Sequence, residues 1–249
     1  MCGTTWAIAL AIALQQQTGS TGFDPANQAW PDDRPIIRLI PNLGQDFRAL
    51  PSEPTLWLAV GGTATSLALS SRDNEVADWM RQQPPSQWAD IGEVLGDGWV
   101  QGAAALFTYG VGRLHDSPKV THMGSDLVRA QILNGILTKS LKLAVDRDRP
   151  DGGGHSFPSG HTAAAFASAS VLHGHFGWKM AVPAYSLAAY IGWTRLREHQ
   201  HWLSDLGAGA TIGLIVGQAV TSGHRQRAWT IAPVPTRGGL GFIVVKNTR

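Results

Sequence analysis

The sequence predicts an all-α protein: a bundle of about six helices followed by a short C-terminal β-hairpin. From Thr55 onward, stretches rich in Ala, Gly, Leu and Val recur at helical length, and segments containing proline, glycine or charges separate them. Near the C-terminus the pattern changes to β-branched residues around the sequence "RGG". At 249 residues the chain is long enough to bury a core of its own.

Two segments precede the predicted bundle. An apolar run from Trp6 to Leu14 has the length of the hydrophobic part of a signal peptide and is too short to span a bilayer. Residues 1–17 are therefore predicted to be a signal peptide and the protein to be exported, although no Lys or Arg precedes the run. Residues 18–54 contain six prolines, which predicts an extended, exposed arm.

The predicted bundle covers residues 55–222. Its helices are expected at residues 55–70, 98–112, 124–145, 160–177, 180–195 and 201–222. A double proline between the first two predicts a short helix or loop there. Residues 223–249 form the expected hairpin or tail, in which Pro233 and Pro235 restrict the first strand to a sheet edge.

Composition excludes several classes of function. Twenty basic and 18 acidic residues are too balanced for a nucleic-acid binder. Cys2 is the only cysteine, so neither an intrachain disulfide nor a cysteine-based metal site is expected. Glycine, serine and threonine dilute the uncharged stretches, and the mean hydropathy of -0.06 is low for a polytopic membrane protein. These values favour a bundle that is soluble or peripherally attached to a membrane.

The first of three polar clusters is "KLAVDRDRP". Lys142 and Arg149 are seven residues apart, which on a continuous helix would place both on one face, and Pro150 would end that helix. Two cations would then flank one site. An isolated basic pair of this kind is more often a solvated helix face.

The second cluster is "PSGH", residues 158–161. Ser159 lies at a predicted helix entrance, and Gly160 allows a close backbone approach to a ligand. The free N–H groups of such a turn can hold phosphate oxygens. The alternative is a capped helix start with His161 exposed to solvent.

The third cluster is "TRLREHQHWLSD". His201 and Asp205 have the i, i+4 spacing, so the carboxylate can accept the proton of one imidazole nitrogen and leave the other free to attack. A structural pair is the alternative. A metal site built on the His-x-His pairs, residues 173 and 175 or 199 and 201, is disfavoured because i and i+2 point to opposite sides of a helix. No metal is predicted.

Together the three clusters resemble the signature of the type 2 phosphatidic acid phosphatase superfamily, which also contains bacterial nonspecific acid phosphatases and vanadium haloperoxidases. The family pattern is K-x6-RP, then PSGH, then SR-x5-H-x3-D. The chain matches its order and spacing over about residues 95–222, except that Thr194 stands where the pattern has serine. Threonine keeps the hydroxyl, so little functional loss is expected.

The resemblance implies a role for each matched residue. His201 would attack phosphorus and form a phosphohistidine, Asp205 would hold its tautomer, and His161 would act first as acid and then as base. The phosphate oxygens would be bound by Lys142, Arg149, Ser159, Gly160 and Arg195. No cofactor is implied, and vanadate would act as an inhibitor.

The substrate class stays open at this stage. Only seven residues, "DGGGHSF", separate the first two motifs, as in the lipid phosphatase branch, which favours a lipid phosphate such as phosphatidic acid or an isoprenoid diphosphate. The location expected for that activity is periplasmic or membrane-associated, with the active site on the outer side. The alternatives are a soluble acid phosphatase, a haloperoxidase with vanadate as cofactor, and a noncatalytic bundle that binds phosphorylated ligands. The sequence does not indicate an oligomeric state.

Overall fold

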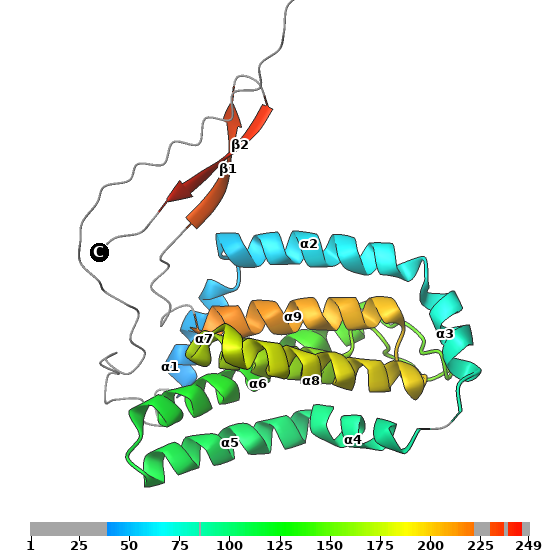
Figure 1. Ribbon diagram of the computed structural model, residues 1–249, viewed down its shortest axis with the longest axis horizontal. Coiled ribbons are helices and arrows are strands. Elements are labelled where there is room, and N and C mark those ends of the chain that lie inside the picture. The colour runs from blue at the N-terminus through cyan, green and yellow to red at the C-terminus, as the bar shows by residue number, and fades with distance from the viewer. Residues whose placement is uncertain (1–38, 85, 222–229, 237–238, 246–249) are drawn as a thin grey trace, which may run out of the picture. The chain divides into compact units, whose positions relative to one another are not determined.

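The computed structural model describes residues 39–84, 86–221, 230–236 and 239–245 (Figure 1). Within these ranges the chain forms helices and one two-stranded sheet. The elements are α1 (Leu39–Ala49), α2 (Glu53–Ser70), α3 (Asp73–Arg81), α4 (Gln87–Gly96), α5 (Gly98–Leu114), α6 (Pro118–Val145), α7 (Gly160–Phe176), α8 (Trp178–Arg197), α9 (Leu203–Thr221), β1 (Thr230–Thr236) and β2 (Gly239–Val245). The predicted signal peptide, residues 1–17, lies outside the described residues.

The predicted all-α class is confirmed. The six predicted helices correspond to α2, α5, α6, α7, α8 and α9. The short segment expected as helix or loop between the first two forms α3 and α4.

The prediction of an extended arm is wrong for residues 39–49, which form α1. Pro41 is the third residue of this helix, where the missing N–H has no intrahelical partner to lose. Asp46 on the same helix is buried and forms an ion pair with Arg129 of α6, which attaches α1 to the bundle. Residues 18–38 of the predicted arm lie outside the described residues.

Helix α7 lies in the centre of the bundle and packs against α6, α8 and α9. Small residues on α9 permit this packing. A Cβ at Gly213 would lie 2.5 Å from the carbonyl oxygen of Ala163, and one at Gly209 would lie 2.6 Å from that of Ser159. The close contact holds the N-terminal ends of α7 and α9 side by side, where the second motif lies and the third motif ends.

Strands β1 and β2 form the antiparallel hairpin that the sequence predicts. Thr230 pairs with Val245 at one end, and Thr236 pairs with Gly239 at the other. Pro233 lies opposite Phe242 in this register. A proline cannot donate a hydrogen bond to a neighbouring strand, which agrees with a two-stranded sheet made only of edges.

Candidate active site

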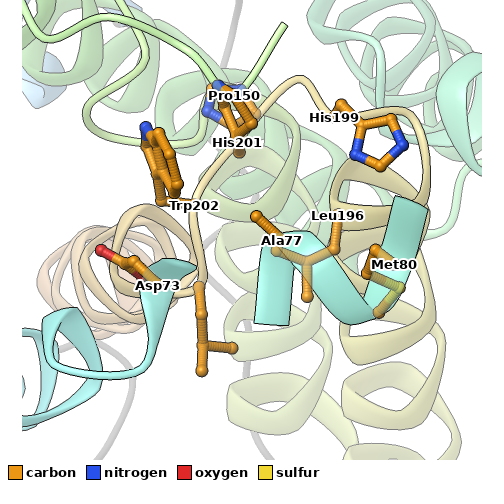
Figure 2. A pocket seen from close by; sticks show the side chains of 9 residues that line it. Asp73, Ala77, Met80, Pro150, Leu196, His199, His201 and Trp202 are labelled. Atoms are coloured by element: carbon orange, nitrogen blue, oxygen red, sulfur yellow. The ribbon is translucent and has the colours of Figure 1, made fainter. Parts of the chain in front are cut away.

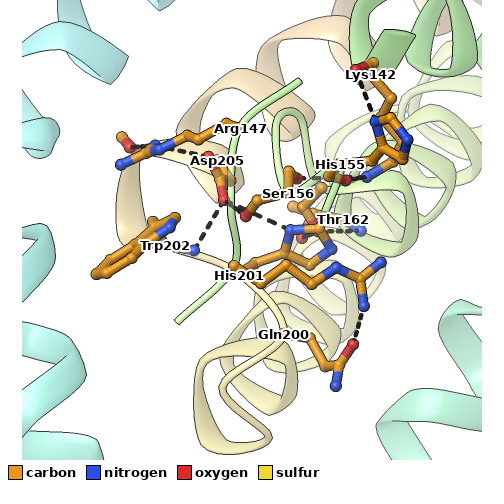
Figure 3. A network of polar contacts seen from close by, with 12 residues as sticks. Lys142, Arg147, His155, Ser156, Thr162, Gln200, His201, Trp202 and Asp205 are labelled. Carbon is orange, nitrogen blue, oxygen red and sulfur yellow. Dashed lines mark hydrogen bonds and ion pairs between the residues drawn. The ribbon is translucent and has the colours of Figure 1, made fainter. Parts of the chain in front are cut away.

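Three segments meet at one end of the bundle: the end of α6 with the loop after it, the start of α7, and the loop between α8 and α9 (Figure 3). Backbone hydrogen bonds join them. Ser159 N–H donates to the carbonyl of Asp205 at 3.1 Å, and Asp151 N–H donates to the carbonyl of His199 at 3.2 Å. The three sequence motifs are therefore brought to one place.

His201 and Asp205 form a buried pair, but not on the face of one helix as predicted. Helix α9 begins at Leu203, so His201 lies in the preceding loop and Asp205 in the first helical turn. The loop returns the imidazole to the carboxylate, and Nδ1 of His201 lies 3.5 Å from Oδ2 of Asp205. Because Nδ1 faces the carboxylate, Nε2 is the nitrogen available to attack.

The carboxylate of Asp205 is fully buried and surrounded by donors. Its Oδ2 accepts hydrogen bonds from the Ser156 hydroxyl and, at 2.9 Å, from the Trp202 N–H. Its Oδ1 accepts from Arg147 at 2.8 Å. Burial alone would raise the pKa of Asp205, but hydrogen bonds from His201, Ser156 and Trp202, together with the Arg147 charge, outweigh it and lower the pKa. Asp205 is therefore ionised at neutral pH.

The imidazole of His201 is neutral at the same pH. Burial lowers its pKa, and the charges of Lys142 and Arg149 lower it further, against the opposing effect of Asp205. A neutral imidazole with its Nδ1 side next to a carboxylate is the protonation state that a nitrogen nucleophile requires.

Lys142 and Arg149 lie close together, but they do not share a helix face as predicted. Helix α6 ends at Val145 because Asp146 adopts a left-handed backbone conformation with φ of 45°, so Arg149 lies in the following loop. The Nζ of Lys142 donates to the carbonyls of His155 at 2.6 Å and Ser156 at 3.3 Å. Burial, and next the charge of Arg149, lower the pKa of Lys142 to about 8.

The start of α7 brings its motif residues to the same place. Ser159 is the buried N-cap, and its Oγ accepts from the Thr162 N–H at 3.4 Å. A Cβ at Gly160 would lie 4.0 Å from Cε of Lys142, so this helix entrance lies beside the lysine. Ser159 thus caps the helix whether or not it also binds a ligand.

His161 follows in the first turn of α7. Burial, and then the charge of Arg195, lower the pKa of His161 to about 4, with smaller contributions from His201 and Lys142. Asp97 opposes this shift. His161 is therefore neutral at pH 7 in the free protein and lies within electrostatic reach of the other motif residues.

Arg195 is paired with an acidic residue that sequence reasoning missed. Its Nη2 lies 2.7 Å from Oε2 of Glu198, and both side chains are largely buried. Burial raises the pKa of Glu198, and Glu93 and Asp90 raise it further, whereas Arg195 opposes them. Because Glu198 is three residues after Arg195 in the third motif, helical spacing was the signal that could have found the pair.

Arg147 and Asp73 are two further residues that sequence reasoning missed. Arg147 lies inside the first motif and donates to Asp205 and, at 2.8 Å, to Asp73 of α3. Asp73 also lines a narrow hollow beside His201 and Trp202, between α3 and the loop that carries His201 (Figure 2). Asp73 and Arg147 are 74 residues apart in the sequence, and no local sequence pattern predicts their contact.

Several buried polar atoms of the site have no hydrogen-bond partner in the described part of the chain. They are Nε of Arg149, Nε2 of His161, Oε1 of Glu198 and Nδ1 of His199. Buried polar groups normally have partners, so a cluster of unpaired ones indicates a place built for a polar ligand. Among the described residues, no group of three or more His, Cys, Asp or Glu side chains is arranged to hold a metal ion.

The fold and the site together define an all-α protein with a histidine–aspartate pair and a group of cations at its helix ends. Residues 151–229 match the family model described as the PAP2 superfamily. This segment contains the second and third motifs, and with the first motif and the helical fold it supports the resemblance to the type 2 phosphatidic acid phosphatase superfamily.

Comparisons with known proteins agree. Over 98 residues, 38% of this chain, it is 37% identical to lipid A 1-phosphatase of Porphyromonas gingivalis, and it covers 22% of that protein. Over 92 residues, 34% of this chain, it is 29% identical to lipid A 4'-phosphatase of Helicobacter pylori, and it covers 46% of that protein. The chain thus spans less than half the length of either relative. The crystal structure of Aquifex aeolicus LpxE has the same fold, with a TM-score of 0.51 and 24% identity over 60% of this chain and 94% of that one.

Proposed function

We propose that the protein is a metal-independent phosphatase that hydrolyses lipid phosphate monoesters or diphosphates through a phosphohistidine at His201. The observation that carries this proposal is the contact between Nδ1 of His201 and Asp205, made beside Lys142 and Arg149. It joins a neutral nitrogen nucleophile, its orienting carboxylate and the positive charge that a phosphate needs.

In the first step, Nε2 of His201 attacks phosphorus, and the bond from phosphorus to the leaving oxygen breaks. The leaving oxygen takes a proton from His161. The proton on Nδ1 stays on the imidazole, and Asp205 stabilises the positive charge that the ring gains. In the second step, neutral His161 takes a proton from water, the oxygen of that water attacks phosphorus, and the P–N bond breaks. Inorganic phosphate leaves, and both histidines return to their starting states.

His161 must carry a proton when the ester binds, although its pKa is about 4 in the free protein. Arg195 and Lys142 are among the charges that depress this pKa. A bound phosphate dianion offsets those positive charges and therefore raises the pKa of His161. Substrate binding thus favours the acid form at the moment when the acid is needed.

The cations that would bind phosphate are occupied in the free protein. Lys142 donates to two backbone carbonyls, Arg149 donates to Gln200, and Arg195 pairs with Glu198. Phosphate oxygens would replace these acceptors, together with the N–H groups at the start of α7. Each cation therefore has a hydrogen-bond acceptor from the protein before the substrate binds.

A lipid substrate is supported by the surface of the bundle. Large apolar side chains are exposed on three helices: Leu56, Trp57, Val60 and Leu67 on α2, Trp99, Leu106, Phe107 and Leu114 on α5, and Trp178 and Val182 on α8. So much exposed apolar surface marks a contact with lipid or protein. Among the described residues, α9 is the one helix long and apolar enough to cross a membrane, and half of that stretch is buried in the bundle.

We therefore propose that the protein is membrane-associated, with lipid against this apolar surface. The similarity to two lipid A phosphatases supports a lipid phosphate as substrate. Export, and an active site on the outer side of the membrane, remain part of the proposal.

The test measures inorganic phosphate release in EDTA from detergent-solubilised phosphatidic acid, an isoprenoid diphosphate and a soluble aryl phosphate. Release that persists in EDTA, is highest for a lipid and is lost in His201→Ala is the expected result. A clear preference for the aryl phosphate would favour a soluble acid phosphatase instead. Halide oxidation by protein that retains vanadium would favour a haloperoxidase, and the absence of any turnover would favour a binding protein.

A further inference from the structure

Asp73 lies outside all three motifs, yet it is bound to the residues that hold Asp205. Its side chain is buried at the start of α3. Its Oδ2 accepts from Arg147 at 2.8 Å and from the Ser204 hydroxyl at 2.6 Å, and its Oδ1 accepts from the Ser204 N–H at 2.9 Å. All three donors come from segments of the site.

Arg147 connects the two carboxylates. One guanidinium nitrogen, Nη2, donates to Asp73, and the other, Nη1, donates to Oδ1 of Asp205 and to the Ser204 hydroxyl, each at 2.8 Å. The guanidinium also lies over the ring of Trp202, 5.2 Å from its centroid. An arginine held on both sides by carboxylates has little freedom to rotate, so its bond to Asp205 is fixed in direction.

The second connection runs through α9. The N–H groups in the first turn of a helix have no intrahelical partner, and Asp73 supplies one for Ser204. The carboxylate of Asp73 on α3 thereby caps the N-terminus of α9. The positive end of the α9 dipole stabilises its negative charge. Ser204 is the residue immediately before Asp205, so this bond fixes the turn that carries the orienting carboxylate.

We propose that Asp73 is a positioning residue for the His201–Asp205 pair and acts through Arg147 and Ser204. It touches neither the nucleophile nor the cations assigned to phosphate. Its effect is to keep Asp205 turned toward Nδ1 of His201, and hence to keep Nε2 free of a proton. This inference rests on the proposed function, because the pair that it orients is the proposed nucleophile and its partner.

The test compares Asp73→Asn with Asp78→Asn. Asn retains the size and one acceptor of Asp73 but removes the charge that faces Arg147. Asp78 lies on the same helix, is exposed and pairs with Arg81 at the surface, so it serves as the matched control. We expect Asp73→Asn to lower kcat by about tenfold or more, in the range typical of outer residues that orient an active site, with KM unchanged. Asp78→Asn should behave as the parent.

A double-mutant cycle separates positioning from a general effect on folding. Because Asp73 acts partly through Arg147, Asp73→Asn combined with Arg147→Gln should lower kcat by less than the two single losses combined. Additive losses, or equal losses in kcat and in the fraction of folded protein by thermal unfolding, would overturn the proposal.

A second readout does not require turnover. In protein labelled with ¹⁵N-histidine, the ring shifts of His201, assigned by comparison with His201→Asn, report which nitrogen carries the proton. We expect the Nδ1–H tautomer in the parent and in Asp78→Asn, and a mixture in Asp73→Asn. If Asp73→Asn keeps the Nδ1–H tautomer, the inference about Asp73 is overturned, but the proposed function is not. Full hydrolysis by His201→Ala would instead overturn the proposed function.

Discussion

Nδ1 of His201 lies 3.5 Å from Oδ2 of Asp205, although the two residues belong to different structural elements, the α8–α9 loop and the first turn of α9. The carboxylate is ionised, and the buried imidazole is neutral. The pair therefore presents Nε2 as a nucleophile, and the first prediction tests this orientation.

Asp205→Asn should lower kcat by roughly 10³- to 10⁴-fold, as expected when a carboxylate that fixes a catalytic histidine's tautomer is made neutral. The amide can donate to Nδ1, which would place the imidazole proton on the attacking nitrogen. Steady-state kinetics measures the loss, and thermal unfolding checks that the variant folds. A kcat equal to that of the parent would remove Asp205 from the mechanism.

His161→Ala should affect esters according to their leaving group. An aryl phosphate releases a stable phenolate without a proton, whereas an alkyl phosphate needs the acid, so the first step should slow by about 10²- to 10⁴-fold more for the alkyl ester. The second step also loses its base, so phosphoenzyme should accumulate with the aryl substrate. Rapid-quench kinetics measures both effects, and an equal loss for the two esters would contradict the acid role.

The lowered pKa of Lys142 predicts that kcat/KM decreases at alkaline pH. Its pKa in the free protein is about 8, and only the protonated amine attracts phosphate, so kcat/KM should fall as pH rises through about 8. In Lys142→Arg the charge persists at high pH, and this fall should move to higher pH. Lys139→Arg, an exposed change on the same helix, should keep the profile of the parent. A profile for Lys142→Arg that matches the parent's would assign the decrease to another group.

Glu198→Gln should lower KM several-fold. The carboxylate of Glu198 lies 2.7 Å from Arg195 and competes with phosphate for it, and the neutral amide competes less. Glu75→Gln removes a comparable ion pair, with Arg72, on the exposed surface of α3 and serves as control. A raised KM in Glu198→Gln would mean that the carboxylate supports Arg195 in binding rather than competing with substrate.

The sequence predicted the parts of the fold and site that depend on local pattern. The long helices and the three motifs follow from residue type and spacing. Spacing predicted correctly that Lys142 and Arg149 lie close together. It did not predict their arrangement, because the left-handed conformation of Asp146 ends the helix and places Arg149 in a loop. Similarly, His201 reaches Asp205 from a loop.

Other features depend on contacts between distant segments. Residues 39–49 contain Pro41 and Gly44, which favour a loop in isolation, whereas the buried ion pair of Asp46 with Arg129 anchors them as α1. Asp73 has no motif around it, and its position is visible only once α3 lies beside the site. Tertiary contacts of this kind leave no periodic signal in the sequence.

The most direct test of the account is to trap the covalent intermediate. The protein would be mixed with radiolabelled phosphatidic acid in EDTA, quenched in alkali and digested, and the labelled peptide would be identified. The account predicts label on His201 that is stable in alkali and lost in acid, and no label in His201→Ala. Label on any other residue, or hydrolysis by the parent with no labelled protein at any time after mixing, would contradict it.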